Sequence, residues 1–266
     1  MMTTSNVFRF LVMLALATIS GGAAAAATIV LDANGAQDVS NLQQIALALH
    51  NYQDTFGRFP AQYIGPVGTP LLSWRVAILP YLGQGVLYSQ FDLSKPWDNP
   101  ANLGLLTQMP AVFRGPLDAI GSTEAAYTAG VDTNTIFPGS PGVTLVSITD
   151  GTSNTILVGE SSGSAIPWTK PEDVAIGSCP TLGGSGFSSF IAGAVPFAFA
   201  DGSIKFLPNS IDCEALRRLF LRNDGSITDT SIALDYVIAS VPEPSTLPLF
   251  GVLLSAVALY RFRSRR

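Results

Sequence analysis

Apolar residues recur at helical spacing along one stretch early in the chain, and this stretch predicts a helix. The helix is expected to begin at Asp38 or Ser40 and to end at Phe56. Ser40 and Gln43 fit a capping box at its start, and Gly57 fits the left-handed residue that commonly follows a helix. One face of this helix should be buried, and its apolar residues are Leu42, Ile45, Leu49, Tyr52 and Phe56.

Downstream of this helix the apolar runs are shorter and have the composition of β-strands. Asp201-Gly202 lies between the runs FAFA and SIKFL, and this pattern predicts a β-hairpin. Residues 73–81 fit a strand or a short helix, and residues 83–91 and 214–221 each predict a short helix. The predicted strands are residues 125–127, 143–148, 155–158, 187–191, 196–200 and 203–207.

The N-terminal residues have the three regions of a secretory signal peptide. Arg9 gives a weakly basic start, residues 10–19 form an apolar core, and a run of small residues follows. We therefore predict that residues 1–27 are a signal peptide, cleaved between Ala25 and Thr28. A retained N-terminal anchor is the less favoured alternative, because the apolar core is short for a membrane span.

The C-terminal stretch has three parts in a fixed order. Val241-Pro242-Glu243-Pro244 cannot continue a helix or pair fully in a sheet, so it should stay extended and accessible to a processing enzyme. Residues 247–260 are uncharged and apolar, and the chain then ends in a basic segment. The arginines of that segment are Arg261, Arg263, Arg265 and Arg266.

This tripartite tail resembles a PEP-CTERM sorting signal, which is read by a membrane protease-transpeptidase called exosortase. The resemblance implies that residues 241–266 are a sorting signal cleaved at the PEP motif. Residues 247–260 would then be a short transmembrane segment, and the arginines would stay on the cytoplasmic side. The apolar run is short for a span. A buried C-terminal helix is the alternative, but four arginines at its end disfavour it.

Two cysteines, Cys179 and Cys213, lie in the intervening residues. In an oxidising compartment an even count favours a disulfide, which would be worth roughly 3–4 kcal/mol for a loop of this length. Two free thiols or a metal-binding pair are the alternatives. Two ligands without a neighbouring histidine are too few for zinc, so no metal site is predicted.

Several segments resemble the DUF1559 family, which is abundant in planctomycetes and whose typical members are pilin-like or pseudopilin-like. They are residues 41–52 (NLQQIALALHNY), 73–76 (SWRV), 150–155 (DGTSNT) and 199–203 (FADGS). The resemblance implies an α+β fold, in which a pilin-like N-terminal helix packs on an antiparallel sheet with a long loop-rich insertion.

The chain also departs from that family in three places. A cleavable signal peptide stands where the filament-forming half-helix of a prepilin would be. Residues 113–118 (FRGPLD) lack the cysteine of the family's FxCPSD segment, and residues 190–194 replace its HxGG segment. Filament assembly by the pilin route is therefore not expected, and neither is any disulfide or ligand role at those positions.

Residues 159–163 (GESSG) fit the G-x-S-x-G nucleophile elbow of serine hydrolases, with Ser161 as the nucleophile. The single histidine, His50, precedes this serine, whereas that fold places the histidine last. His50 also sits on the predicted helix, where a packing role is more common than catalysis. A serine hydrolase is therefore the least favoured function.

A structural role is favoured for the other polar and aromatic residues that could bind a ligand. Asp150 and Asp201 could bind calcium, but turn-forming aspartates are favoured, since each is followed by glycine. Glu160 ends an apolar strand, and a salt bridge to Arg75 or a helix N-terminus would explain it. Aromatic residues could line a sugar-binding face, although packing is favoured for them. They are Trp74, Trp97, Trp168, Tyr63, Tyr81 and Tyr88.

Residues 28–240 are predicted to form one exported domain that carries 9 Lys and Arg against 18 Asp and Glu. This acidity excludes a nucleic-acid partner. We expect a non-enzymatic cell-surface or extracellular-matrix protein without a cofactor, exported through the inner membrane and transiently anchored in it. The expected partners are exosortase, the membrane through residues 247–260, and exopolysaccharide or envelope proteins. A sugar- or solute-binding protein and a pseudopilin-like subunit are the alternatives.

Overall fold

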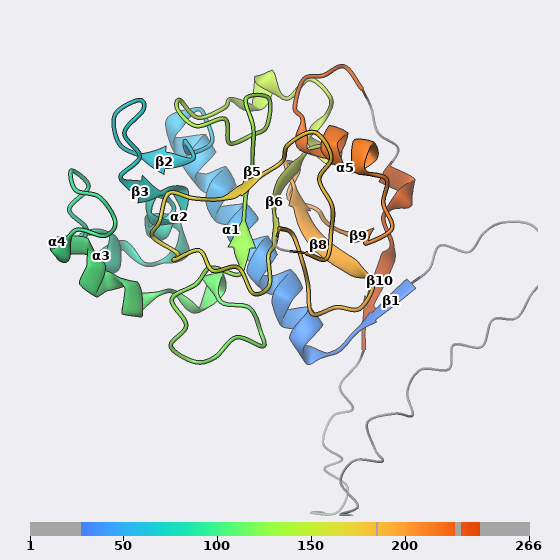
Figure 1. Ribbon diagram of the computed structural model, residues 1–266, viewed down its shortest axis with the longest axis horizontal. Coiled ribbons are helices and arrows are strands. Elements are labelled where there is room, and N and C mark those ends of the chain that lie inside the picture. The colour runs from blue at the N-terminus through green and yellow to red at the C-terminus, as the bar shows by residue number, and fades with distance from the viewer. Residues whose placement is uncertain (1–27, 185, 227–229, 240–266) are drawn as a thin grey trace, which may run out of the picture.

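A computed structural model describes residues 28–184, 186–226 and 230–239 (Figure 1). The predicted signal peptide, residues 1–27, and the predicted sorting signal, residues 241–266, lie outside the described residues. The same holds for the predicted transmembrane segment, residues 247–260. In the part of the chain that is described, no helix combines the length and the apolar character that a membrane crossing needs.

The described residues form an α+β fold with one long N-terminal helix. The α-helices are α1 (Ala33–Phe56), α2 (Trp74–Ala77), α3 (Gly85–Tyr88), α4 (Pro100–Leu103) and α5 (Cys213–Phe220). The strands are β1 (Thr28–Leu31), β2 (Tyr63–Ile64), β3 (Leu72–Ser73), β4 (Tyr127–Thr128), β5 (Gly130–Val131), β6 (Ile156–Glu160), β7 (Val174–Ala175), β8 (Ala194–Phe199), β9 (Ile204–Pro208) and β10 (Asp235–Ile238). The prediction of an α+β fold with an N-terminal helix and antiparallel strands is confirmed.

Helix α1 begins earlier than its apolar pattern predicted. Asp32 caps it, because its side chain accepts a hydrogen bond of 2.9 Å from the Gly35 N–H. The predicted start at Asp38 or Ser40 is therefore wrong, and Ser40 lies inside the helix. The first turns contain few apolar residues, so periodicity alone could not reveal them. The predicted end is confirmed, since Gly57 adopts a left-handed conformation with φ of 72°.

The apolar stripe of α1 packs against the core along most of its length. Leu42, Ile45 and Leu49 are fully buried, as predicted, and Tyr52 is half-buried. Phe56 is 56% exposed, so its predicted burial is wrong. It lies at the last turn of the helix, where its ring contacts Tyr52 rather than the sheet.

The main sheet is antiparallel and has the strand order β4–β6–β8–β9. The predicted hairpin is confirmed, because β8 and β9 pair with Asp201-Gly202 at their turn. Residues 143–148 do not form the predicted strand, since Leu145–Ser147 is a turn of 3-10 helix. Residues 187–191 make isolated bridges only. Neither stretch forms the paired strand that its apolar composition predicted, because its backbone makes loop contacts instead.

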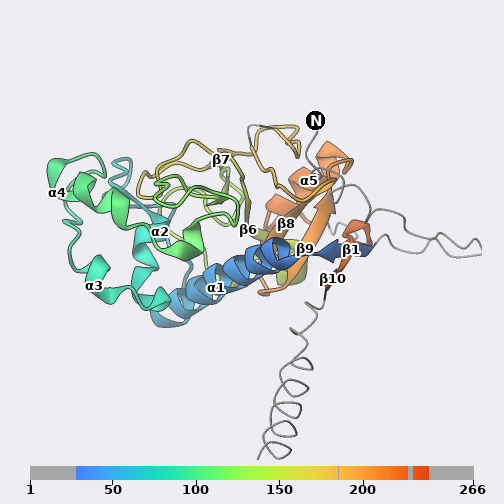
Figure 2. The same ribbon diagram turned by 90° about the horizontal axis from the view of Figure 1, so that it is seen from below.

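Helix α1 lies between the β1 and β10 strands on one side and α3 on the other (Figure 2). At its N-terminal end lies the small parallel sheet of β1 and β10, in which Thr28 pairs with Asp235 and Leu31 with Ile238. At the other end lie α2, α3 and α4. The first and last described residues of the chain therefore belong to the same end of the fold.

A second core cluster packs α5 against the face of the main sheet that lies away from α1. Phe187, Phe197 and Phe220 contact one another there, with ring centroids 5.0–5.9 Å apart. Beside this cluster a disulfide joins Cys179 to Cys213, the first residue of α5. The loop before β8 is thus covalently attached to the helix that covers it.

The packing of α1 makes a direct stability prediction. Ile45→Ala or Leu49→Ala should each lower the free energy of unfolding by about 2–5 kcal/mol, because each empties a fully buried position. Leu47→Ala is the matched control on the same helix. Leu47 is 61% exposed, so its truncation should change stability by about 0.5 kcal/mol or less. Urea unfolding checks this, and equal losses in all three variants would contradict the assigned helix face.

Candidate functional site

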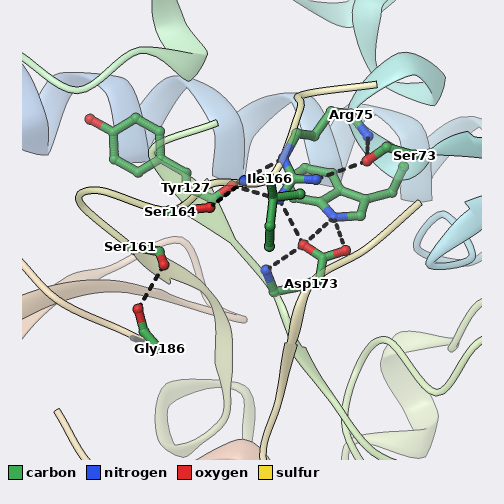
Figure 3. A network of polar contacts seen from close by, with 10 residues as sticks. Ser73, Arg75, Tyr127, Ser161, Ser164, Ile166, Asp173 and Gly186 are labelled. Carbon is green, nitrogen blue, oxygen red and sulfur yellow. Dashed lines mark hydrogen bonds and ion pairs between the residues drawn. The ribbon is translucent and has the colours of Figure 1, made fainter. Parts of the chain in front are cut away.

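The serine of the G-x-S-x-G segment is buried and bonded to the backbone. Ser161 directly follows β6, and its Oγ donates a hydrogen bond of 2.7 Å to the Gly186 carbonyl (Figure 3). His50 lies on α1, where its ring packs edge-on against Phe59. The structure therefore does not bring the candidate nucleophile and the candidate base together, and the elbow motif here is a strand end.

A fully buried ion pair joins Arg75 and Asp173 (Figure 3). Arg75, in α2, approaches the Asp173 carboxylate with its Nη2 at 2.7 Å, and both side chains are 0% exposed. The same guanidinium donates to the Tyr127 carbonyl through Nε and Nη2, at 3.0 and 2.8 Å, and to the Ser73 hydroxyl through Nη1 at 2.9 Å. Arg75 thus ties α2 to β4 and to the start of β7.

The Asp173 carboxylate is surrounded by donors. In addition to Arg75, it accepts hydrogen bonds from the Trp74 indole at 3.1 and 3.2 Å and from the Ala129 N–H at 3.0 Å. Burial raises the pKa of Asp173 and lowers the pKa of Arg75, and the charge of each partner opposes that effect on the other. The predicted salt bridge between Arg75 and Glu160 is therefore wrong. Asp173 supplies the counter-charge instead.

Glu160 belongs to a separate buried acid cluster that faces α1. It pairs with Tyr127 across the β4–β6 ladder and is 0% exposed. The Tyr127 hydroxyl donates to Asp38 Oδ1 at 2.5 Å and accepts from Asn41 Nδ2 at 3.1 Å. Among the described residues, no well-aligned hydrogen bond reaches either Glu160 oxygen or Asp38 Oδ2. The two carboxyls can bond each other only if they share a proton.

The titration of this cluster follows from its burial. Burial raises the pKa of Asp38 to about 6, and hydrogen bonding by Tyr127 opposes the rise. Burial also raises the pKa of Glu160 to about 9, with a further contribution from the charge of Asp38 and a smaller opposing effect of Ser189. Near neutral pH the pair therefore holds at least one proton, and that proton can bridge the two carboxyls.

The two Asp-Gly aspartates have different roles. Asp201 accepts hydrogen bonds from the Ser203 N–H and hydroxyl at 2.9 and 2.6 Å, so its predicted turn role is confirmed. Asp150 instead accepts from the Asp224 and Gly225 N–H groups, at 2.8 and 3.0 Å, which fastens a loop distant in sequence. Among the described residues, no three His, Cys, Asp or Glu side chains are placed to hold a metal ion.

The aromatic residues do not gather on one exposed face. Trp74 and Trp168 are fully buried, and Trp168 stacks on Phe113 with centroids 6.0 Å apart. Trp97 is half-buried at the edge of the same core. The remaining members of the set, Tyr63, Tyr81 and Tyr88, are likewise half-buried. The favoured packing reading is confirmed for the two buried tryptophans.

Among the described residues, two of the open grooves have linings that could hold a ligand. One, of about 550 Å³, lies beside Ser161 between residues 161–166 and 172–181. The other, of about 320 Å³, lies between α1 and residues 111–116. Sequence reasoning missed the second groove and also Asp38, Tyr127 and Asp173, because no local motif marks a buried acid or its distant partner.

A comparison with protein-family models found a match to part of the chain. Residues 36–135 match the family model described as "Protein of unknown function (DUF1559)", and this match confirms the predicted resemblance to DUF1559 over that segment. Asp38, Arg75 and Tyr127 lie inside the matched segment, whereas Glu160 and Asp173 lie beyond it. Searches of curated proteins and of solved structures found no match to the chain.

Proposed function

We propose that the protein is a non-enzymatic, exported component of the cell surface or extracellular matrix, sorted by exosortase at its PEP motif. The observation that carries this proposal is the tail, residues 241–266, in which the PEP motif, the apolar run and the arginines occur in the required order. The signal-like residues 1–27 support the same route from the other terminus.

Two features of the described domain support export. The Cys179–Cys213 disulfide suits an oxidising compartment outside the cytoplasm. The last strand, β10, pairs with the first strand, β1, and the Ala239 N–H still donates to the Leu31 carbonyl. The PEP motif begins at Val241, two residues after Ala239, which is the last residue that the structure describes.

We further propose that the domain is a pilin-like head without the filament-forming half-helix. The packing of α1 across the antiparallel sheet β4–β6–β8–β9 supports this arrangement. The half-helix of a pilin would have to precede β1, where the chain has a signal-like segment instead. Residues 28–240 should therefore remain monomeric, and ordered filaments of this fragment would favour the pseudopilin alternative.

Processing at both ends is the first test of this proposal. The mature protein from the surface fraction should begin between Ala25 and Thr28 and should contain no peptide from residues 247–266. Tryptic and semi-tryptic mass spectrometry of that fraction makes the measurement. A Pro242→Ala, Pro244→Ala double variant should keep its tail, because the extended motif is lost. Surface material that retains Met1 or Arg266 would contradict the proposal.

The hydrolase alternative has its own test. The purified protein should hydrolyse p-nitrophenyl acetate no faster than its Ser161→Ala variant, because the Ser161 hydroxyl is occupied by the Gly186 carbonyl and has no histidine base. Ser164→Ala serves as a control on the same loop. Hydrolysis that disappears only in Ser161→Ala would move the protein to the serine hydrolases.

A further inference from the structure

The groove between α1 and residues 111–116 has a lining that suits a polar ligand. On the helix side it is lined by Gln37, Asn41 and Gln44, which share one helix face at spacings of four and three residues. On the other side lie Val112, Arg114 and Pro116. Figure 2 shows α1, the helix that carries these three residues, along its length.

Arg114 is the feature that points to an anion. Its Nε atom is buried and has no hydrogen-bond partner among the described residues, and no described acid pairs with its guanidinium. Asp118, on the same segment, accepts from the Gly115 N–H instead. A partly buried guanidinium without a counter-charge is costly, and a carboxylate can satisfy it through two parallel hydrogen bonds.

The helix side supplies uncharged donors and acceptors. Asn41 is fixed as the floor of the groove, because it donates to the Arg114 carbonyl and to the Tyr127 hydroxyl and accepts from Gln37. Gln44 donates to the Ser40 carbonyl and hydroxyl, which leaves its own carbonyl oxygen available to a ligand. A side-chain amide carries both donors and an acceptor, so it can bond a ligand hydroxyl in either direction.

We propose that this groove binds an acidic saccharide, with a hexuronic acid carboxylate on Arg114 and ring hydroxyls on Gln37 and Gln44. The groove holds about 320 Å³, which suits one or two sugar rings at the lower limit of ligand pockets. The proposed site does not depend on the export route, so a binding measurement tests it independently of the proposed function.

The chemistry of the lining favours this ligand over two others. A phosphate would bring a second negative charge close to Asp118 and to the buried pair Asp38 and Glu160, whose charges already act on one another. A peptide terminus would match Arg114, but an extended peptide gains most of its affinity from an exposed strand edge. The groove is lined by a helix and an irregular segment instead.

Isothermal titration of the full chain in mild detergent at pH 7 tests the proposal. The ligands are trigalacturonic acid, the neutral galactose trisaccharide of the same linkage, and a tripeptide with a free or an amidated C-terminus. Trigalacturonic acid should bind, and the neutral trisaccharide should bind at least about tenfold more weakly. Arg114→Gln should weaken the acidic ligand at least about tenfold, and Gln44→Ala about two- to fivefold.

Arg58→Gln is the matched control, because Arg58 is an exposed arginine that does not line the groove. It should leave the Kd unchanged within about twofold, since salt screens distant charges. Gln44→Ala alters only an exposed helix position, so it reports on the groove even if Arg114→Gln unfolds. Equal binding of acidic and neutral saccharides overturns the proposal. So does binding that survives both Arg114→Gln and Gln44→Ala, or binding of the free-acid peptide alone.

Discussion

Replacing Asp173 with asparagine should lower the free energy of unfolding by about 3–5 kcal/mol. The substitution keeps the size of the side chain but leaves the Arg75 guanidinium charged and 0% exposed without its counter-ion. Arg75→Met should have a loss of similar size, because it leaves the Asp173 carboxylate unpaired. The double variant should lose about 2 kcal/mol less than the sum of the single losses, since neither charge then remains. Urea unfolding of residues 28–240 measures all three.

A surface pair in the same domain is the control for this experiment. Arg218 and Glu214 lie four residues apart on α5 and interact at 3.1 Å, but their side chains are 45% and 50% exposed. Glu214→Gln should therefore change stability by about 0.5 kcal/mol or less. Strict additivity of the two central substitutions would show that Arg75 and Asp173 do not stabilise one another, and the central pair would lose its assigned role.

Local patterns were sufficient wherever local interactions decide the structure. The hairpin of β8 and β9 was predictable because Asp201-Gly202 sets its own turn, and the Asp201 side chain bonds only two residues ahead. The buried face of α1 was predictable because helical spacing places Ile45 and Leu49 on one side. The end of α1 was also predictable, because the left-handed conformation that ends the helix is a local property of Gly57.

Tertiary partners were not predictable, because nothing local encodes them. Arg75 and Asp173 are 98 residues apart, and the sequence-based prediction named only Glu160 as a partner of Arg75. The register of β4 against β6 determines where Glu160 lies. It places Glu160 opposite Tyr127, whose hydroxyl bonds Asp38 of α1 and whose carbonyl accepts from Arg75. One tyrosine thus separates the two buried charge clusters.

The groove on α1 shows the same limit for a candidate site. No sequence motif marks Gln37, Asn41 or Gln44 as ligand-binding, and Gln37 lies before the start that the apolar pattern predicted for the helix. Only the fold places Arg114 beside them, through the hydrogen bond from Asn41 Nδ2 to the Arg114 carbonyl. No sequence motif marks Arg114, because only the folded structure shows that no described acid lies close enough to pair with its guanidinium.

The stability of the domain should fall as pH rises from about 5 to about 9, and Glu160→Gln should remove most of that fall. Asp38 and Glu160 have pKa values raised to about 6 and about 9 by burial, above the ordinary values of 3.8 and 4.5. The folded state therefore binds more protons than the unfolded chain throughout this window. Their stability contribution is complete below pH 4 and is lost as the pH passes through the two raised pKa values.

The expected size and the control follow from the same linkage. Each group that is protonated only in the folded state lowers stability by about 1.4 kcal/mol per pH unit, so Glu160 alone should account for about 3 kcal/mol between pH 6 and pH 8. Glu160→Gln removes this titration and should exceed the wild type in stability at pH 8. Glu172→Gln, at a side chain 50% exposed, should keep the wild-type dependence. Urea unfolding across the range decides the matter. A wild-type stability that rises from pH 6 to pH 8 would mean that Glu160 is ionised in the folded protein, with a cation beside it.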